Sequence, residues 1–210
     1  ILVFLVRDQP KAPVRELHLA VGMKAFSSKF KRYLLVALIF GLGNFSNAFF
    51  ILNTKILLTP ALGSTGASQT TILLYALMNV IYALSSLPIG ALSDKVGKRT
   101  FLGAGYLAFG LTCFGFMFIT GDVYMIAGLF VLAGFFAASV DTLERAYTAD
   151  LVQPELRGTG YGTLHTVNGI ADLPASVIAG FLWSAFSPSM TFMYGGIMAF
   201  LAVFTLLAIR

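Results

Sequence analysis

The sequence contains little charge for its length. Of 210 residues, 11% are Asp, Glu, Lys or Arg and 58% are hydrophobic, and the mean hydropathy is +0.85. Soluble domains contain about 25% charged and 45 to 50% apolar residues, so an ordinary water-soluble globule is excluded. A helix of about 20 apolar residues crosses a hydrocarbon core roughly 30 Å thick. The composition therefore predicts an all-α integral membrane protein.

Cysteine and histidine are nearly absent as well. The single cysteine, Cys113, lies in an apolar run, which excludes a disulfide framework and a cysteine-based metal cluster. His18 and His165 are the two histidines, and their separation speaks against paired metal ligation and against Ser–His catalysis. No predicted strand precedes Gly158 and Gly160, so a dinucleotide fold is not expected. We therefore predict no metal, no cofactor and no enzymatic activity.

Six apolar stretches follow one another along the chain and predict a six-helix bundle over residues 33–210. The predicted spans cover residues 33–58, 70–92, 101–119, 123–143, 159–185 and 190–209. Residues 7–32 hold seven basic side chains and two prolines, and we expect them to form a cytoplasmic connector. Residues 1–6 are apolar and do not begin with methionine, so we expect them to end an earlier transmembrane helix.

The net charge is +5, and the basic residues responsible for it are concentrated in particular turns and do not cover one face of the protein. Of the 14 basic residues, Lys55 alone lies outside the connector, the 95–99 turn, the 145–157 segment and Arg210. Positive turns stay in the cytoplasm, so the pattern predicts a multi-pass protein of the cytoplasmic membrane with both ends of the six-span unit inside. The bilayer and a small-molecule solute are the expected partners, and nucleic acid is not.

Polar side chains within the spans are expected to face the bundle interior or a water-filled path, because hydrocarbon solvates them poorly. A group of amide and phenol side chains predicts a solute-binding cavity, and hydrogen bonding between helices is the alternative. The group consists of Asn44, Asn47, Asn79, Tyr82 and Asn168.

The fifth span carries a polar stripe, because His165, Asn168 and Asp172 stand at positions i, i+3 and i+7. A carboxylate at that depth is a candidate for taking up a proton. We predict that Asp172 couples transport to protons, with His165 as a relay. A structural pairing of Asp172 with a neighbouring helix remains the alternative.

The turn between the second and third spans is short, glycine-flanked and basic. It reads Gly90-Ala91-Leu92-Ser93-Asp94-Lys95-Val96-Gly97-Lys98-Arg99. This string resembles the signature of the major facilitator superfamily, G-x-L-[SA]-D-[RK]-x-G-[RK]-[RK], at every specified position. The family carries it between helices 2 and 3 and again between helices 8 and 9. With a basic connector before the first span, the resemblance implies family helices 7 to 12 of a prokaryotic-type member. The partner would be an N-terminal six-helix half of the same protein.

Residues 144–158 resemble the family's loop between helices 10 and 11. The resemblance implies that Arg145, at a helix end, meets Asp94 and closes a cytoplasmic gate. The implied gating residues are Gly90, Asp94, Lys95, Gly97, Lys98, Arg99, Glu144 and Arg145. The alternative is an ion pair within one helix between Asp141 and Arg145, at i and i+4.

The resemblance implies secondary active transport of a small organic solute by alternating access, coupled to protons or along a gradient. Fold does not determine the cargo, so the solute, the direction and the coupling ion stay open. The rival function is a six-span membrane scaffold or an oligomeric channel subunit that transports nothing.

Overall fold

The computed structural model describes residues 26–209, which form helices with no strand in that range. The helices are α3 (Ser28–Gly43), α4 (Ala48–Val96), α5 (Lys98–Phe118), α6 (Val123–Leu151), the 3-10 turn η1 (Pro154–Leu156), α7 (Arg157–Ala185) and α8 (Pro188–Ala208). The expected helix end at 1–6 and the connector up to residue 25 lie outside the described residues. The last five connector residues, 28–32, are helical, because Ser27 caps α3 by accepting a hydrogen bond from the Phe30 amide.

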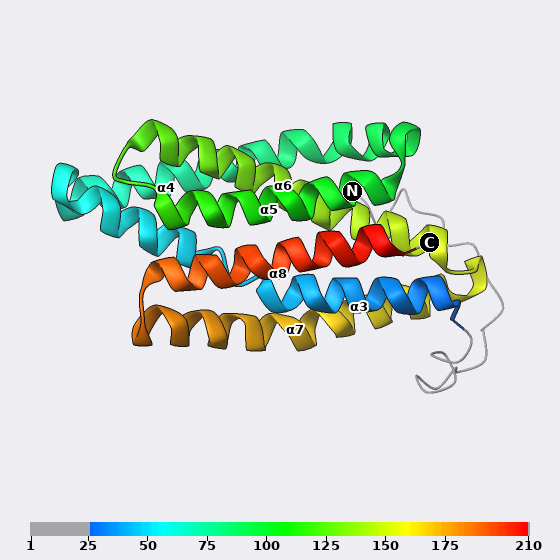
Figure 1. The fold of residues 1–210 in the computed structure, drawn as a ribbon. Coiled ribbons are helices and arrows are strands. Elements are labelled where there is room, and N and C mark those ends of the chain that lie inside the picture. Colours follow the sequence, from blue (N-terminus) through cyan, green and yellow to red (C-terminus); the bar gives the residue numbers. More distant parts are fainter. Residues whose placement is uncertain (1–25, 210) are drawn as a thin grey trace, which may run out of the picture.

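Helix α4 contains two antiparallel arms that meet at Gly63. Gly63 has φ 67° and ψ 169°, a left-handed backbone that glycine adopts without steric cost, and Pro60 stands just before it. Figure 1 shows the chain reversing its direction within α4. The stretch between the predicted spans 33–58 and 70–92 is therefore helical apart from this one residue.

The first predicted span, 33–58, is interrupted in the structure. Helix α3 ends at Gly43, and α4 begins at Ala48. Asn and Ser side chains compete for backbone hydrogen bonds and so favour helix ends, and the Ser46 hydroxyl accepts from the Ala48 amide. The segment 44–47 thus divides one span into two helical pieces.

Four helical stretches of the described chain have the length and apolar composition of membrane spans. They are Ser28–Val96, which includes both arms of α4, and then Lys98–Phe118, Val123–Leu151 and Pro188–Ala208. Helix α7 is 29 residues long, but it carries the polar stripe with Asp172 and is less apolar than the others. Helix α6 extends eight residues past the predicted end at 143.

The helices form two groups, with α4, α5 and α6 on one side and α3, α7 and α8 on the other (Figure 1). Aromatic rings fill the space between the groups. Phe50 of α4 stacks on Phe192 of α8 with ring centroids 5.7 Å apart, and both side chains are fully buried. Phe109 and Phe116 of α5 join this cluster. Rings contribute large buried areas, so the cluster holds the two groups together.

Helix α6 lies so close to α4 that Gly134 has no room for a side chain. A Cβ at this position would meet the Met78 carbonyl oxygen at 2.6 Å and the Ile81 Cβ at 2.8 Å. Gly128, six residues earlier on the same helix, is exposed, and a Cβ there would meet nothing within 4 Å. Small residues permit this kind of backbone approach where lipid removes the hydrophobic drive for helix association.

We predict opposite effects for alanine at these two glycines. Gly134→Ala should lower the free energy of unfolding by about 1 to 3 kcal/mol, because α6 must move away from α4. Gly128→Ala should leave it unchanged or raise it by up to about 1 kcal/mol, since alanine favours helix. Thermal unfolding of the two variants in detergent measures the difference. Equal midpoints would contradict the close contact.

Candidate functional site

A cavity of about 710 Å³ opens beside the break in the first span. Its walls come from the break, the second arm of α4, α6 and α7. Four of the five residues expected to face a solute line it, namely Asn44, Asn47, Asn79 and Tyr82. Asp172 of α7 lines it as well. The structure therefore gathers polar groups from separate spans around one space of the size of a small-molecule site.

The break itself forms one wall of this cavity. Asn44 follows the last residue of α3, and Asn47 precedes the first residue of α4. The Ser46 amide donates to the Ser176 hydroxyl of α7 over 3.4 Å, which ties the break to the opposite wall. Interrupted membrane helices expose backbone and side-chain polar groups at solute sites in other transporters.

A smaller pocket of about 300 Å³ adjoins the cavity and shares Asn44, Asp141 and Asp172 with it. The expected polar stripe of α7 is found here, since His165, Asn168 and Asp172 all line this pocket. Asn168 therefore lies in the smaller pocket and not in the larger cavity where we expected it. Asp172 lies between the two spaces and borders both.

Glu144 is buried, with 5% of its surface exposed, and it accepts hydrogen bonds from three neighbouring helices. Its Oε1 accepts a hydrogen bond from the Tyr106 hydroxyl of α5 at 2.9 Å, and its Oε2 accepts from Asn168 Nδ2 of α7 at 2.7 Å. The Tyr33 hydroxyl of α3 donates to its backbone carbonyl at 3.3 Å. Glu144 is thus engaged in hydrogen bonds within the bundle, and its place in the cytoplasmic gate stays a prediction. Since α6 continues to Leu151, Glu144 is inside the helix and joins four helices.

The sequence reasoning missed Tyr106 and Tyr33. Tyr106 is the single tyrosine of the third predicted span. A phenol hydroxyl that is buried within an apolar span needs a hydrogen-bond partner. That requirement could have indicated a polar contact inside the bundle, but it could not have named Glu144.

Asp141 occupies the wall common to both spaces. Its Oδ2 accepts from the Tyr82 hydroxyl at 2.7 Å, and its Oδ1 lies 4.0 Å from Arg145 Nη2. Asp141 and Arg145 stand at i and i+4 on α6, and both side chains are more than half exposed. Among residues 26–209, the acid that forms an ion pair with Arg145 is Asp141, and Arg145 forms none with Asp94 in this part of the chain.

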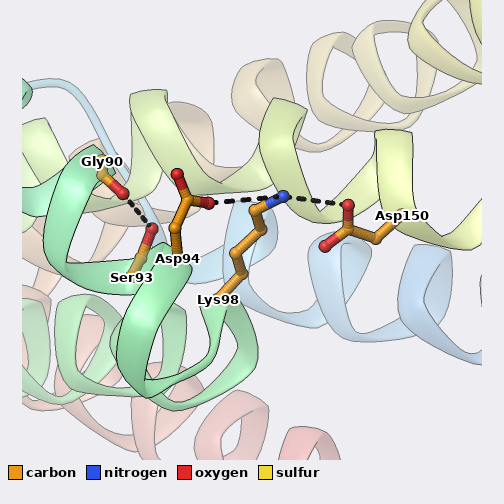
Figure 2. Close-up of polar contacts among 5 residues, drawn as sticks. All are labelled: Gly90, Ser93, Asp94, Lys98 and Asp150. Carbon is orange, nitrogen blue, oxygen red and sulfur yellow. Dashed lines mark hydrogen bonds and ion pairs between the residues drawn. The ribbon is translucent and has the colours of Figure 1, made fainter.

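The signature turn connects α4 to α5 through Gly97, whose φ of 111° favours glycine. Figure 2 shows its polar contacts. The Ser93 hydroxyl donates to the Gly90 carbonyl at 2.7 Å. Lys98 Nζ lies 2.9 Å from Asp150 Oδ1 of α6 and 3.7 Å from Asp94 Oδ1 (Figure 2). The lysine therefore connects the turn to α6.

Arg99 connects the same turn to α8. Its Nε donates to the Leu206 carbonyl at 3.1 Å, and its Nη2 donates to the Leu207 carbonyl at 2.6 Å. These carbonyls belong to the last turn of α8, where helices leave acceptors unpaired and favour cations. Lys95 is exposed. Two adjacent basic residues thus anchor α5 to two different helices.

Comparison with known proteins identifies the family of this chain. The sequence profile of the Major Facilitator Superfamily matches residues 33–210. The chain belongs to this superfamily. Its all-α fold and its family are therefore as the signature turn predicted, and it is a multi-pass membrane protein of a transporter family.

Three known proteins are similar to the chain over different lengths. The uncharacterized MFS-type transporter MJ1317 of Methanocaldococcus jannaschii is 36% identical over 207 residues, which are 99% of this chain and 51% of that protein. YfkF of Bacillus subtilis, also an uncharacterized MFS-type transporter, is 28% identical over 57% of this chain and 30% of its own length. Human synaptic vesicle glycoprotein 2C is 29% identical over 51% of this chain and 15% of its own length. The chain spans about half the length of the archaeal relative.

The contacts of Glu144 lead to a stability prediction. Glu144→Ala leaves the buried Tyr106 hydroxyl and the half-buried Asn168 amide without their acceptor. The loss costs about 1 to 3 kcal/mol for the buried hydroxyl and less for the amide. Glu144→Gln keeps one acceptor oxygen and should cost less. Thermal unfolding in detergent should rank the wild type above the glutamine variant and the glutamine variant above the alanine variant.

Glu155 provides the matched control, because it is an exposed acid in η1. Glu155→Ala should unfold like the wild type. A Glu144→Ala variant as stable as Glu155→Ala would show that the buried hydrogen bonds contribute nothing.

Proposed function

We propose that the chain is the C-terminal six-helix half of a secondary active transporter that moves a small organic solute by alternating access. The observation that carries the proposal is the polar cavity at the break in the first span, in a chain of a transporter superfamily. A cavity between helices of one half becomes a transport path when a second half covers and uncovers it. The relative of twice the length supports such a second half in the same protein.

The protein is proposed to lie in the cytoplasmic membrane with both ends of the six-span unit inside. The support is the distribution of basic residues. Lys98 and Arg99 in the signature turn, and Arg145 near the end of α6, fall on this proposed cytoplasmic side.

The signature turn is proposed to form the cytoplasmic gate toward the other half. Lys98 and Arg99 are engaged within the chain, whereas 68% of the Asp94 side chain is exposed. An exposed carboxylate at a braced turn is free to form a charge-assisted contact with a helix end or a base of the other half. Such a contact would form on closing and break on opening.

Proton coupling is proposed to reside in Asp172, with His165 as relay. Support comes from their position, since both line the smaller pocket and Asp172 also borders the larger cavity. A carboxylate at this place can exchange a proton with one space while the solute occupies the other.

Asp172→Asn tests this coupling in the full-length protein reconstituted in vesicles. A solute panel is first screened for exchange, and the solute that moves is then followed with and without a pH gradient. The variant should lose accumulation driven by the gradient, because asparagine cannot take up the proton, and should keep exchange without a gradient. Glu155→Gln, at an exposed acid outside the pockets, is the control. Unchanged accumulation at every pH would exclude Asp172 as the coupling group.

Asp94→Asn tests the gate. Loss of a charge-assisted contact of about 1.4 kcal/mol or more should slow solute exchange about tenfold and leave solute binding largely intact. Asp122→Asn is the matched control at the opposite membrane side, where Asp122 caps α6 by accepting from the Tyr124 and Met125 amides. A variant that binds solute weakly but exchanges it at the normal rate would contradict the gate.

A further inference from the structure

The charged side chains around the larger cavity are of one sign. Sixteen residues line it, and the charged members of this set are Asp141 and Asp172. Lysine, arginine and histidine are missing from this lining set. Arg145 and His165 line the smaller pocket instead. The larger cavity therefore presents two acids to its contents.

The two acids differ in how the protein satisfies them. Asp141 receives the Tyr82 hydroxyl and has Arg145 at 4.0 Å. For Asp172, the described residues provide neither a hydrogen bond nor an ion pair within the distances at which such contacts form. A carboxylate within a membrane protein is costly without a counter-charge, and Asp172 borders the larger cavity as well as the smaller pocket.

The neutral groups of the lining also favour a cation. Asn79 donates its Nδ2 to the Tyr75 carbonyl at 2.7 Å, which leaves its Oδ1 available as an acceptor. The rings of Tyr75 and Tyr82 lie on the same wall, and aromatic faces attract cations. Acceptors and rings together suit a ligand with N–H donors or a quaternary centre on an apolar body.

The break in the first span does not oppose this preference. The C-terminus of α3 and the N-terminus of α4 meet at the cavity, and they bring helix dipole ends of opposite sign. Their effects on a charged ligand offset each other, so the carboxylates decide the sign. A volume of about 710 Å³ is also too large for a bare inorganic ion and suits an organic molecule.

We propose that the cargo is an organic cation, with a positively charged group that lies against Asp172 and Asp141 and an apolar body that contacts the tyrosine wall. This inference rests on the proposed function, in which the larger cavity is the cargo site. It deepens that function by naming the chemical class of the cargo. An anion would meet two like charges, and a neutral solute would leave Asp172 without a counter-charge.

The test uses the full-length protein in lipid nanodiscs and three probes of similar shape. Tetraphenylphosphonium is the cation, tetraphenylborate the anion and triphenylphosphine oxide the neutral probe. Equilibrium dialysis measures their binding, and protein-free nanodiscs correct for partition into lipid. The cation should bind at least about tenfold more tightly than the other two probes. Equal or tighter binding of the borate or the oxide would overturn the proposal.

Variants locate the binding. Asp141→Asn combined with Asp172→Asn should abolish the preference for the cation, whereas Glu155→Gln should preserve it. Preference that persists in the double variant would overturn the proposal. If the double variant fails to fold, the single variants Asp172→Asn and Asp172→Glu test the proposal. Glutamate keeps the charge and should retain cation binding, whereas asparagine should weaken it about tenfold.

Solute exchange in vesicles separates this inference from the function on which it rests. Exchange of a neutral or anionic solute, with no response to cations, would leave the transporter intact and overturn the cationic cargo. Cation binding that depends on the two acids, in a protein that exchanges no solute, would overturn transport and retain the cation site.

Discussion

A polar group that the bilayer cannot solvate must find its partner within the helix bundle, and this requirement organises the interior of the chain. Glu144 is the clearest case, because its carboxylate takes hydrogen bonds from α5 and α7 while its carbonyl takes one from α3. Each of these bonds replaces water that hydrocarbon excludes. The packing of four helices therefore depends on one buried acid as well as on the aromatic cluster.

The same requirement explains why the two polar spaces differ. In the smaller pocket, Asn168 is already committed to Glu144, so its amide contributes to structure. In the larger cavity, Asn44 and Asn47 lie at helix ends, where the backbone is itself incompletely paired.

Composition and the ordered signature turn were enough to predict an all-α membrane fold and its superfamily, because both depend on local runs of residues. Helix limits were less predictable. Polarity after residue 143 indicated a helix end, yet α6 continues, since its backbone hydrogen bonds need no apolar side chains. The break at 44–47 and the reversal at Gly63 depend on single Asn, Ser and Gly positions that hydropathy does not resolve.

The site was predictable to the extent that helical spacing determines it. The stripe of His165, Asn168 and Asp172 lies on one side of α7, as three- and four-residue spacing requires. Contacts between distant segments could not be read in this way. Glu144 with Tyr106 joins residues 38 positions apart, and the choice of Asp141 over Asp94 by Arg145 depends on how α4 and α6 are placed.

The signature turn both connects helices within the chain and presents an exposed acid. Lys98 reaches Asp150 of α6, and Arg99 reaches the last carbonyls of α8, so the N-terminus of α5 is held from both sides. The long side chains of Lys98 and Arg99 are thereby held within the chain, while the short side chain of Asp94 stays largely exposed. A turn that is rigid on its inner side and carries an exposed acid outward can make or break a contact without deforming the bundle. That property is what the proposed rocking of the six-helix unit as one body requires.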